Sequence, residues 1–279
     1  MGGERADTCD LKWWGLTDKG PFRKNNEDAF LALTFDQYDL RLLGKEGEAD
    51  FELGDFVFAV SDGMGGANAG EFASRIAISR ITERFPKQYR TEAIKQPGAH
   101  EAALVRLFEV IHAEMTVMGM HYEECRGMGA TLSLMWLTPG MGYFCHAGDS
   151  RIYHLPGGGE DIIQLTEDHT HVGWLFRQGK INEREARFHE GRHMLQMAMG
   201  GRHSDISPQV GSVEIKPGDR FVFCTDGLIE GLWDNTINRL VRNPPPRLAG
   251  EQPARRLLKE ALNESGRDNT TVIVLEFPA

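Results

Sequence analysis

Short runs of consecutive apolar residues, separated by glycine, proline and acidic residues, dominate the hydrophobic pattern of this 279-residue chain. The clearest run extends from Phe56 to Val60 and ends at Ser61-Asp62-Gly63. An apolar run of this length, bounded by glycine, is typical of a buried strand. By the same criterion we expect strands at residues 12–17, 29–35, 127–137, 141–147, 151–155, 161–165, 221–224 and 272–277.

Apolar residues at helical spacing predict helices in other segments. Five apolar residues between Ala69 and Ala77 occupy positions i, i+3, i+4, i+7 and i+8, which places them on one helix face. Similar stripes predict helices at residues 101–121 and 254–262, with a short one at 237–241. Strands and helices therefore occur in groups without regular alternation, which favours an α+β class with antiparallel sheets and helices layered outside them.

Two polar segments interrupt this pattern. Residues 36–55 are acidic with three glycines, and we expect a surface excursion between strands there. Residues 167–201 are rich in His, Arg and Glu and are too long for a plain connection, which indicates a small helical insertion or a mobile lid. A histidine metal site in this second segment is an alternative that the spacing of the histidines disfavours.

Composition narrows the classes of function. The net charge is -10, from 31 basic and 41 acidic residues, and no basic run is present, so nucleic acid is not expected as a partner. No apolar stretch approaches the length of a membrane span, and no secretory signal is visible, so we expect no membrane association. The four cysteines lack metal-ligand spacing and are expected to be reduced, as in a cytoplasmic protein.

Four predicted strand ends carry an aspartate each: Asp62, Asp149, Asp226 and Asp268. These could be four independent turns, because Asp-Gly pairs commonly end strands. They could also converge, and carboxylates a few ångströms apart raise each other's pKa or require a cation between them. Oxygen ligands of this kind favour Mg²⁺, Mn²⁺ or Ca²⁺ over zinc. Gly63 fits the second alternative, since a backbone without a Cβ can approach an ion closely.

Five segments, in order, resemble the signatures of the PP2C-type metal-dependent protein phosphatases in their bacterial form. The segments are residues 23–28 (RKNNED), 62–66 (DGMGG), 148–151 (GDSR), 225–227 (TDG) and 268–269 (DN). The resemblance covers nearly the whole chain. It implies a single domain over residues 1–279, built as a central antiparallel β-sandwich with a pair of helices on each outer face, and a flap at about residues 167–201.

The resemblance also implies a centre of two metal ions, usually Mn²⁺ or Mg²⁺, at one end of the sandwich. Asp62 resembles the ligand that bridges both ions, and Gly63 matches a backbone-carbonyl ligand. Asp226 and Asp268 resemble ligands of the first ion. Paired divalent ions lower the pKa of water toward neutrality, which would supply the nucleophile for hydrolysis of a phosphate ester.

The remaining matched positions surround this centre. Glu27 and Asp28 match acidic positions that hold metal-bound waters or the second ion. Asp149, with Asp226, matches the site of a third, weaker ion. Arg23 resembles the arginine that grips the substrate phosphate, since its planar fork can meet two phosphate oxygens.

We therefore expect a serine/threonine protein phosphatase that acts on phosphorylated proteins and counters serine/threonine kinases. A catalytically silent module of the same fold is an alternative, although such a copy would be expected to lose metal ligands. A Ca²⁺-binding sandwich without chemistry is a second alternative, and it leaves Arg23 without a role.

Overall fold

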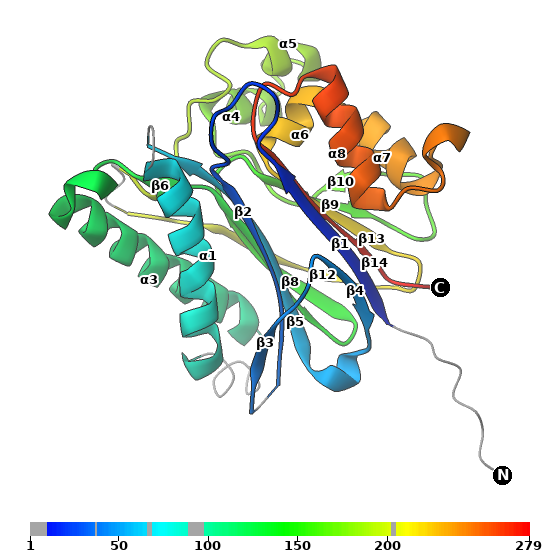
Figure 1. Cartoon of the computed structure of the whole chain (residues 1–279), viewed down its shortest axis with the longest axis horizontal. Helices are drawn as coiled ribbons and strands as arrows, with labels where there is room; N and C mark the ends of the chain where they lie inside the picture. The colour runs from blue at the N-terminus through cyan, green and yellow to red at the C-terminus, as the bar shows by residue number, and fades with distance from the viewer. Residues whose placement is uncertain (1–9, 37, 66–68, 89–97, 202–204) are drawn as a thin grey trace.

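The computed structural model describes residues 10–36, 38–65, 69–88, 98–201 and 205–279. Two antiparallel β-sheets pack face to face, and helices cover both outer faces (Figure 1). The predicted α+β class with α/β/β/α layers is therefore confirmed. No helix in the described part of the chain is long and apolar enough to cross a membrane.

All strand pairs in the two sheets are antiparallel. The smaller sheet consists, from edge to edge, of β10 (Ile163–Gln164), β9 (Arg151–Leu155), β13 (Arg220–Cys224), β14 (Thr270–Glu276), β1 (Leu11–Asp18) and β4 (Glu46–Ala49). The larger sheet has the order β11 (Met199–Gly200), β6 (Gly129–Ala130), β5 (Asp55–Met64), β7 (Leu132–Thr138), β8 (Met141–Ala147) and β12 (Gln209–Glu214). Two further strands extend this sheet, with β2 (Asp28–Phe35) pairing with β5 and β3 (Leu40–Leu42) pairing with β2.

The run from Phe56 to Val60 shows why these strands are apolar without interruption. Phe56, Phe58 and Val60 lie in the core between the two sheets, whereas Val57 and Ala59 pack into the core beneath the helices. Successive side chains of a strand point to opposite faces, and both faces of this strand are covered. Strands β13 and β14 follow the same rule in the other sheet.

Helices close the two outer faces. The larger sheet is covered by α1 (Ala69–Gln88) and α3 (Ala99–His121), as predicted. The smaller sheet is covered by α6 (Asp226–Gly231), α7 (Asp234–Arg242) and α8 (Pro253–Glu264), so a short third helix joins the expected pair. In the described residues, three short 3₁₀ turns complete the regular structure: Phe51–Leu53, Glu123–Cys125 and Pro246–Leu248.

The acidic segment at residues 36–55 is more than the predicted surface excursion. It contributes β3 to the larger sheet and β4, paired with β1, to the smaller one. The segment therefore supplies a strand to each sheet as the chain crosses the sandwich.

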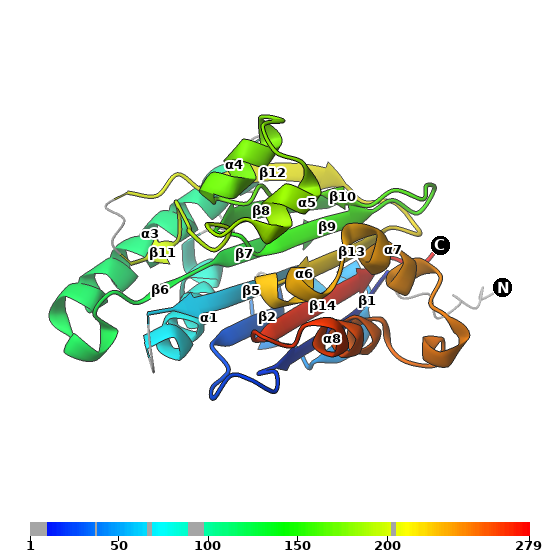
Figure 2. The same cartoon turned by 90° about the horizontal axis from the view of Figure 1, so that it is seen from above.

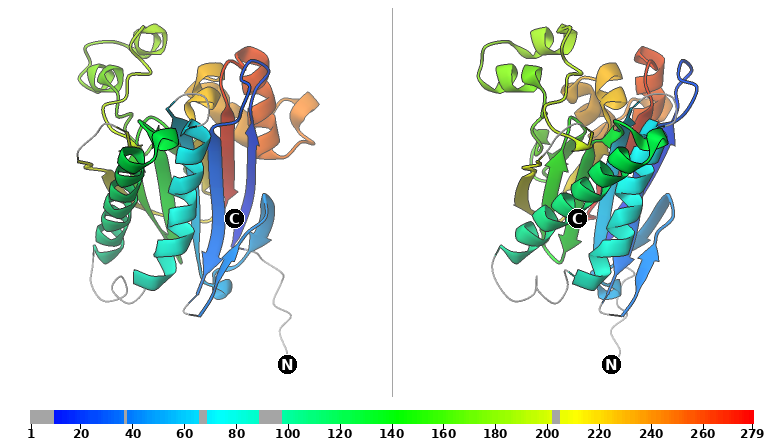
Figure 3. Two further views of the ribbon diagram at one scale, coloured as in Figure 1. Left: turned by 60° about the vertical axis from the view of Figure 1, so that its left-hand side comes forward. Right: turned by 90° about the vertical axis from the view of Figure 1, so that its left-hand side faces the viewer.

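The segment at residues 167–201, called the flap below, contains α4 (His171–Arg177) and α5 (Glu183–Phe188) before it returns as β11. These helices lie beyond the ends of the strands, beside α6 (Figures 2 and 3). Thr170 and Asn182 cap them, and Asn182 forms a capping box with Glu185. Side-chain caps of this kind fix where a short helix begins.

Candidate metal centre

The predicted site residues gather where the core between the two sheets reaches one end of the sandwich. Asp28 and Asp62 are directly opposite each other on β2 and β5. Asp62 continues the row of alternate residues that contains Phe58 and Val60, so it lies on the face that points between the sheets. The Thr225 hydroxyl donates a 2.8 Å hydrogen bond to Asp28 Oδ2, which links this pair to the other sheet.

Loops from distant parts of the sequence complete the same end. Arg23, in the loop between β1 and β2, forms a 2.6 Å ion pair with Asp268, which precedes β14. The backbone amide of Glu27 donates to the side-chain oxygen of Asn269 at 2.7 Å. The loop between β1 and β2, which contains Arg23 and Glu27, is therefore held against Asp268 and Asn269 at the start of β14.

Mutual repulsion marks these carboxylates as one electrostatic group. Burial, followed by the charges of Asp28 and Asp226, holds the pKa of Asp62 well above its usual range. Burial raises the pKa of Asp28 to about 7, although hydrogen bonds from Thr271 and Thr225 lower it in part. Burial and the charge of Asp226 also raise the pKa of Asp149 and of Asp268. A cation among these groups would remove the repulsion.

Two buried oxygen atoms in the group are without hydrogen-bond partners. They are Asp28 Oδ1 and Asp226 Oδ1. Buried polar atoms are almost always satisfied, so an orphaned carboxylate oxygen indicates a missing ion or water. Among the described residues, no three His, Cys, Asp or Glu side chains form a cluster with the geometry of a metal site. The fit to a cation therefore rests on the orphaned oxygens, because carboxylate oxygens are the ligands that Mg²⁺ or Mn²⁺ prefers.

Two glycines allow the backbone to assemble around the site. A Cβ atom on Gly63 would lie 1.9 Å from the carbonyl oxygen of Gly70 at the start of α1. A Cβ atom on Gly227 would lie 2.0 Å from the carbonyl oxygen of Asn269. Close approach of two chain segments thus accounts for glycine after Asp62 and after Asp226, independently of any ligand role for Gly63.

The other predicted site residues, Arg23, Glu27 and Asp149, lie around this acidic group. Arg23 is 49% exposed at its side chain, so its guanidinium is accessible even while it is paired with Asp268. Burial raises the pKa of Glu27, and the charge of Arg23 opposes that shift. Asp149 follows β8, in the turn before β9, within electrostatic reach of Asp226.

Sequence reasoning missed the residue that connects Asp62 to this turn. Thr131 Oγ1 accepts a hydrogen bond from the Asp62 amide at 2.9 Å, and the Thr131 amide donates to the Asp62 carbonyl at 2.8 Å. The Thr131 and Ser150 hydroxyls lie 2.7 Å apart, next to Asp149. A single threonine between two apolar strands, β6 and β7, carries no sequence signal for this role.

Histidines of the flap approach the site without forming a metal cluster in the described residues. His193 Nδ1 lies 3.6 Å from Asp226 Oδ2, and its Nε2 lies 3.4 Å from Glu230. His169 accepts a hydrogen bond from the Gly148 amide and stacks on His146, so it supports the turn that holds Asp149. His203 lies outside the described residues.

Comparison with known proteins decides the family. Residues 49–265 match the family model described as Protein phosphatase 2C. The chain belongs to this family. It is 29% identical to the serine/threonine protein phosphatase PstP of Mycobacterium tuberculosis over 96% of its own length, and it spans 45% of that relative.

Solved structures of family members superimpose on the whole fold. Stp1 of Staphylococcus aureus is 25% identical, with a TM-score of 0.81 and 100% of both chains covered. The catalytic domain of PstP, solved in complex with two manganese ions, is 29% identical, with a TM-score of 0.69 and 96% and 99% of the two chains covered.

Proposed function

We propose that this chain is a metal-dependent serine/threonine protein phosphatase that uses Mn²⁺ or Mg²⁺. The observation that carries the proposal is the pair of orphaned buried oxygens of Asp28 and Asp226, inside a group of mutually repelling aspartates. The two manganese ions in the PstP structure support the same assignment. When bound, two divalent ions supply a water of lowered pKa and the positive charge that an anionic substrate needs.

The residues of the chain have separate tasks in this proposal. Asp62 would be shared by the two ions, Asp226 and Asp268 would hold the first, and the Gly63 carbonyl would add a ligand. Asp28 and Glu27 would hold the second ion or its waters, and Asp149 with Asp226 would hold a third, weaker one. All of these groups are hard oxygen donors, and the carboxylates among them offset the charge of the ions.

Arg23 meets the phosphate of the substrate. Its guanidinium is half-exposed and is kept beside the acidic group by Asp268. A planar fork of this kind can donate two parallel hydrogen bonds to phosphate oxygens, which orients the phosphoryl group. Correct orientation and charge stabilisation supply most of the rate in phosphoryl transfer.

The partners follow from the reaction. We propose phosphorylated proteins as substrates, including serine/threonine kinases and the proteins that they modify, and a cytosolic place of action. The described cysteines, Cys125, Cys145 and Cys224, are all free, which is consistent with a reducing compartment.

The proposal is tested by following the hydrolysis of p-nitrophenyl phosphate and of a phosphothreonine peptide. We expect turnover with Mn²⁺, loss of turnover in excess EDTA, and recovery when Mn²⁺ is added back, because the ions supply the nucleophilic water. Equal rates with Mn²⁺ and in EDTA would refute metal-dependent hydrolysis. Metal binding without turnover of either substrate would favour a silent module.

Replacement of Arg23 separates its substrate role from metal binding. At saturating Mn²⁺, we expect Arg23→Ala to raise KM for the phosphopeptide about 10-fold and to lower kcat less, because a phosphate contact made on binding is lost. Arg23→Lys should show an intermediate KM, since it keeps the charge without the fork. Lys24→Ala, at the exposed neighbouring position, is the matched control. An unchanged KM in Arg23→Ala would exclude the phosphate contact.

A further inference from the structure

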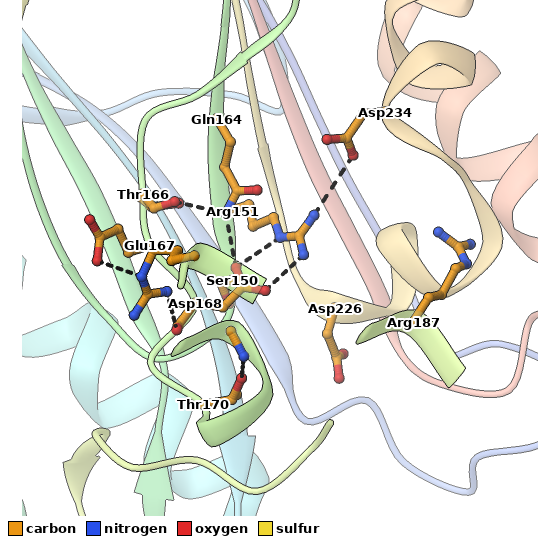
Figure 4. Close-up of polar contacts among 12 residues, drawn as sticks. Ser150, Arg151, Gln164, Thr166, Glu167, Asp168, Thr170, Arg187, Asp226 and Asp234 are labelled. Atoms are coloured by element: carbon orange, nitrogen blue, oxygen red, sulfur yellow. Dashed lines mark hydrogen bonds and ion pairs between the residues drawn. The ribbon is translucent and has the colours of Figure 1, made fainter. Parts of the chain in front are cut away.

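A large cavity separates the flap from the body of the protein. It has a volume of about 720 Å³ and extends from the flap helices to Asp149 and Asp226 of the candidate metal centre. Figure 4 shows its polar wall, where residues of β9 and of the loop before α4 lie close to Asp226. Cavities of this size are typical of ligand sites and have room for several residues of an extended peptide.

Most charges that line the cavity already have partners in the protein. Arg151 donates to both carboxylate oxygens of Asp168, at 2.9 and 2.7 Å. Arg177 forms a 2.9 Å ion pair with Glu167 in the same wall. An additional anion in the cavity would therefore have to compete with existing ion pairs.

The guanidinium of Arg187 also has partners in the protein. It donates to the backbone carbonyls of Glu230 and Leu232, at 2.8 and 3.1 Å, and lies 4.2 Å from the centre of the Trp233 ring. This arrangement fastens α5 to the end of α6, the helix that begins with Asp226. The Arg187 guanidinium therefore holds the flap in place over the cavity.

The remaining wall of the cavity is apolar and partly exposed. Val172 and Phe176 of α4 and Phe188 of α5 line it on the flap side, and Ile229 of α6 lines it on the other side. Phe176 is 46% exposed and Phe188 is 69% exposed. Two exposed phenylalanines around one cavity are typical of a surface that becomes covered by a binding partner.

We propose that this cavity receives the substrate segment next to the phosphorylated residue and favours a large apolar side chain in that segment. The proposal rests on the proposed phosphatase function, because the continuity of the cavity with Asp149 and Asp226 places its occupant beside the reacting phosphate. An acidic flanking residue gains little beside Arg151, Arg177 or Arg187, since each of these arginines already has partners in the protein. The cavity thereby determines which phosphorylated sequences bind well.

The test measures binding of fluorescein-labelled peptides in which a non-hydrolysable phosphonate analogue replaces phosphothreonine. Each of the two positions on either side is changed in turn to Phe, Ser or Glu, and Kd is measured by fluorescence anisotropy with Mn²⁺. At one or more positions we expect Phe to bind about 5- to 10-fold more tightly than Glu, the gain expected from covering one aromatic side chain in part. In Phe188→Ala, and separately in Phe176→Ala, this preference should fall to within about twofold.

Met194→Ala is the matched control, because Met194 is also in the flap and 70% exposed but does not line the cavity. It should retain the full preference for Phe. Equal binding of the Phe and Glu peptides, a preference for Glu, or a preference that persists in Phe188→Ala would overturn the proposal. Thermal unfolding of each variant checks that its fold is intact. If a variant does not fold, the relative affinities of the wild-type protein for the Phe and Glu peptides still test the proposal.

Hydrolysis of p-nitrophenyl phosphate by the wild-type protein is measured in parallel. A preference for Phe peptides without any hydrolysis would refute the proposed function and leave the cavity as a peptide site. Hydrolysis without a flanking preference would refute the cavity proposal and leave the function standing.

Discussion

Asp62→Asn is expected to lower the Mn²⁺-dependent kcat on the order of 10³-fold, since even the loss of residues that only orient metal ligands costs 10- to 100-fold. Asp62 is the carboxylate on which the charges of Asp28, Asp149, Asp226 and Asp268 all act. The substitution removes the charge that two ions would share, so both should bind more weakly.

The same substitution should leave the metal-free fold intact. Asn has nearly the same shape as Asp, and it removes one of several like charges that repel each other, so the metal-free melting temperature should not fall. The stabilisation of the wild-type protein by Mn²⁺ should be lost in the variant, because a ligand stabilises only the state that binds it. Asp161→Asn, at an exposed position before β10, is the control. More than a tenth of wild-type activity in Asp62→Asn would exclude the bridging role.

Arg151→Met is expected to have the largest effect on stability, lowering the free energy of unfolding by about 2–4 kcal/mol. Arg151 and Asp168 each have a side-chain exposure of only 19%. Burial raises the pKa of Asp168, but the Arg151 guanidinium, together with His146 and Gln164, leaves that pKa below its usual value. Without Arg151, a largely buried carboxylate is left without its counter-charge, and the 2.8 Å hydrogen bond to the Tyr153 hydroxyl is lost as well.

Arg151 and Asp168 are not expected to contribute equally to the free energy of unfolding. Asp168→Asn should destabilise less than Arg151→Met, because Arg151 keeps a second carboxylate, Asp234, at 3.7 Å. The double variant Arg151→Met/Asp168→Asn should be more stable than the sum of the two single effects predicts, because each single variant leaves the other partner unpaired. Urea denaturation of the four proteins measures this difference. Strict additivity would show that the pair is not coupled.

The layers of the fold could be predicted because β5 and β14 each contain an uninterrupted apolar run, at residues 56–60 and 272–275. Strands covered on both faces have this pattern, so their place in the middle of the sandwich follows from the sequence. Helix α6 was not predicted, since its six residues are too few to establish a helical period. Strand β12 was also missed, because it lies at a sheet edge and alternates between half-buried and exposed positions.

Part of the candidate site could also be predicted from the apolar runs of the sequence. Asp62 and Asp226 each stand one residue after an apolar run, at residues 56–60 and 221–224, so their position at strand ends can be inferred. The ion pair of Arg151 with Asp168 cannot be inferred in this way. That pair joins two strongly polar segments through tertiary packing, and nothing local distinguishes Asp168 from the other acids of the flap. Thr131 was missed for the same reason, since its partner Asp62 is 69 residues away.

X-ray diffraction from crystals of the protein grown with Mn²⁺, recorded at the manganese absorption edge, tests the metal centre most directly. We expect two anomalous peaks among Asp28, Asp62, Asp226 and Asp268, because these residues share one electrostatic field and contain the orphaned oxygens. A map with no peak among these four residues at saturating Mn²⁺, or with peaks only elsewhere, would contradict metal-dependent catalysis at this site.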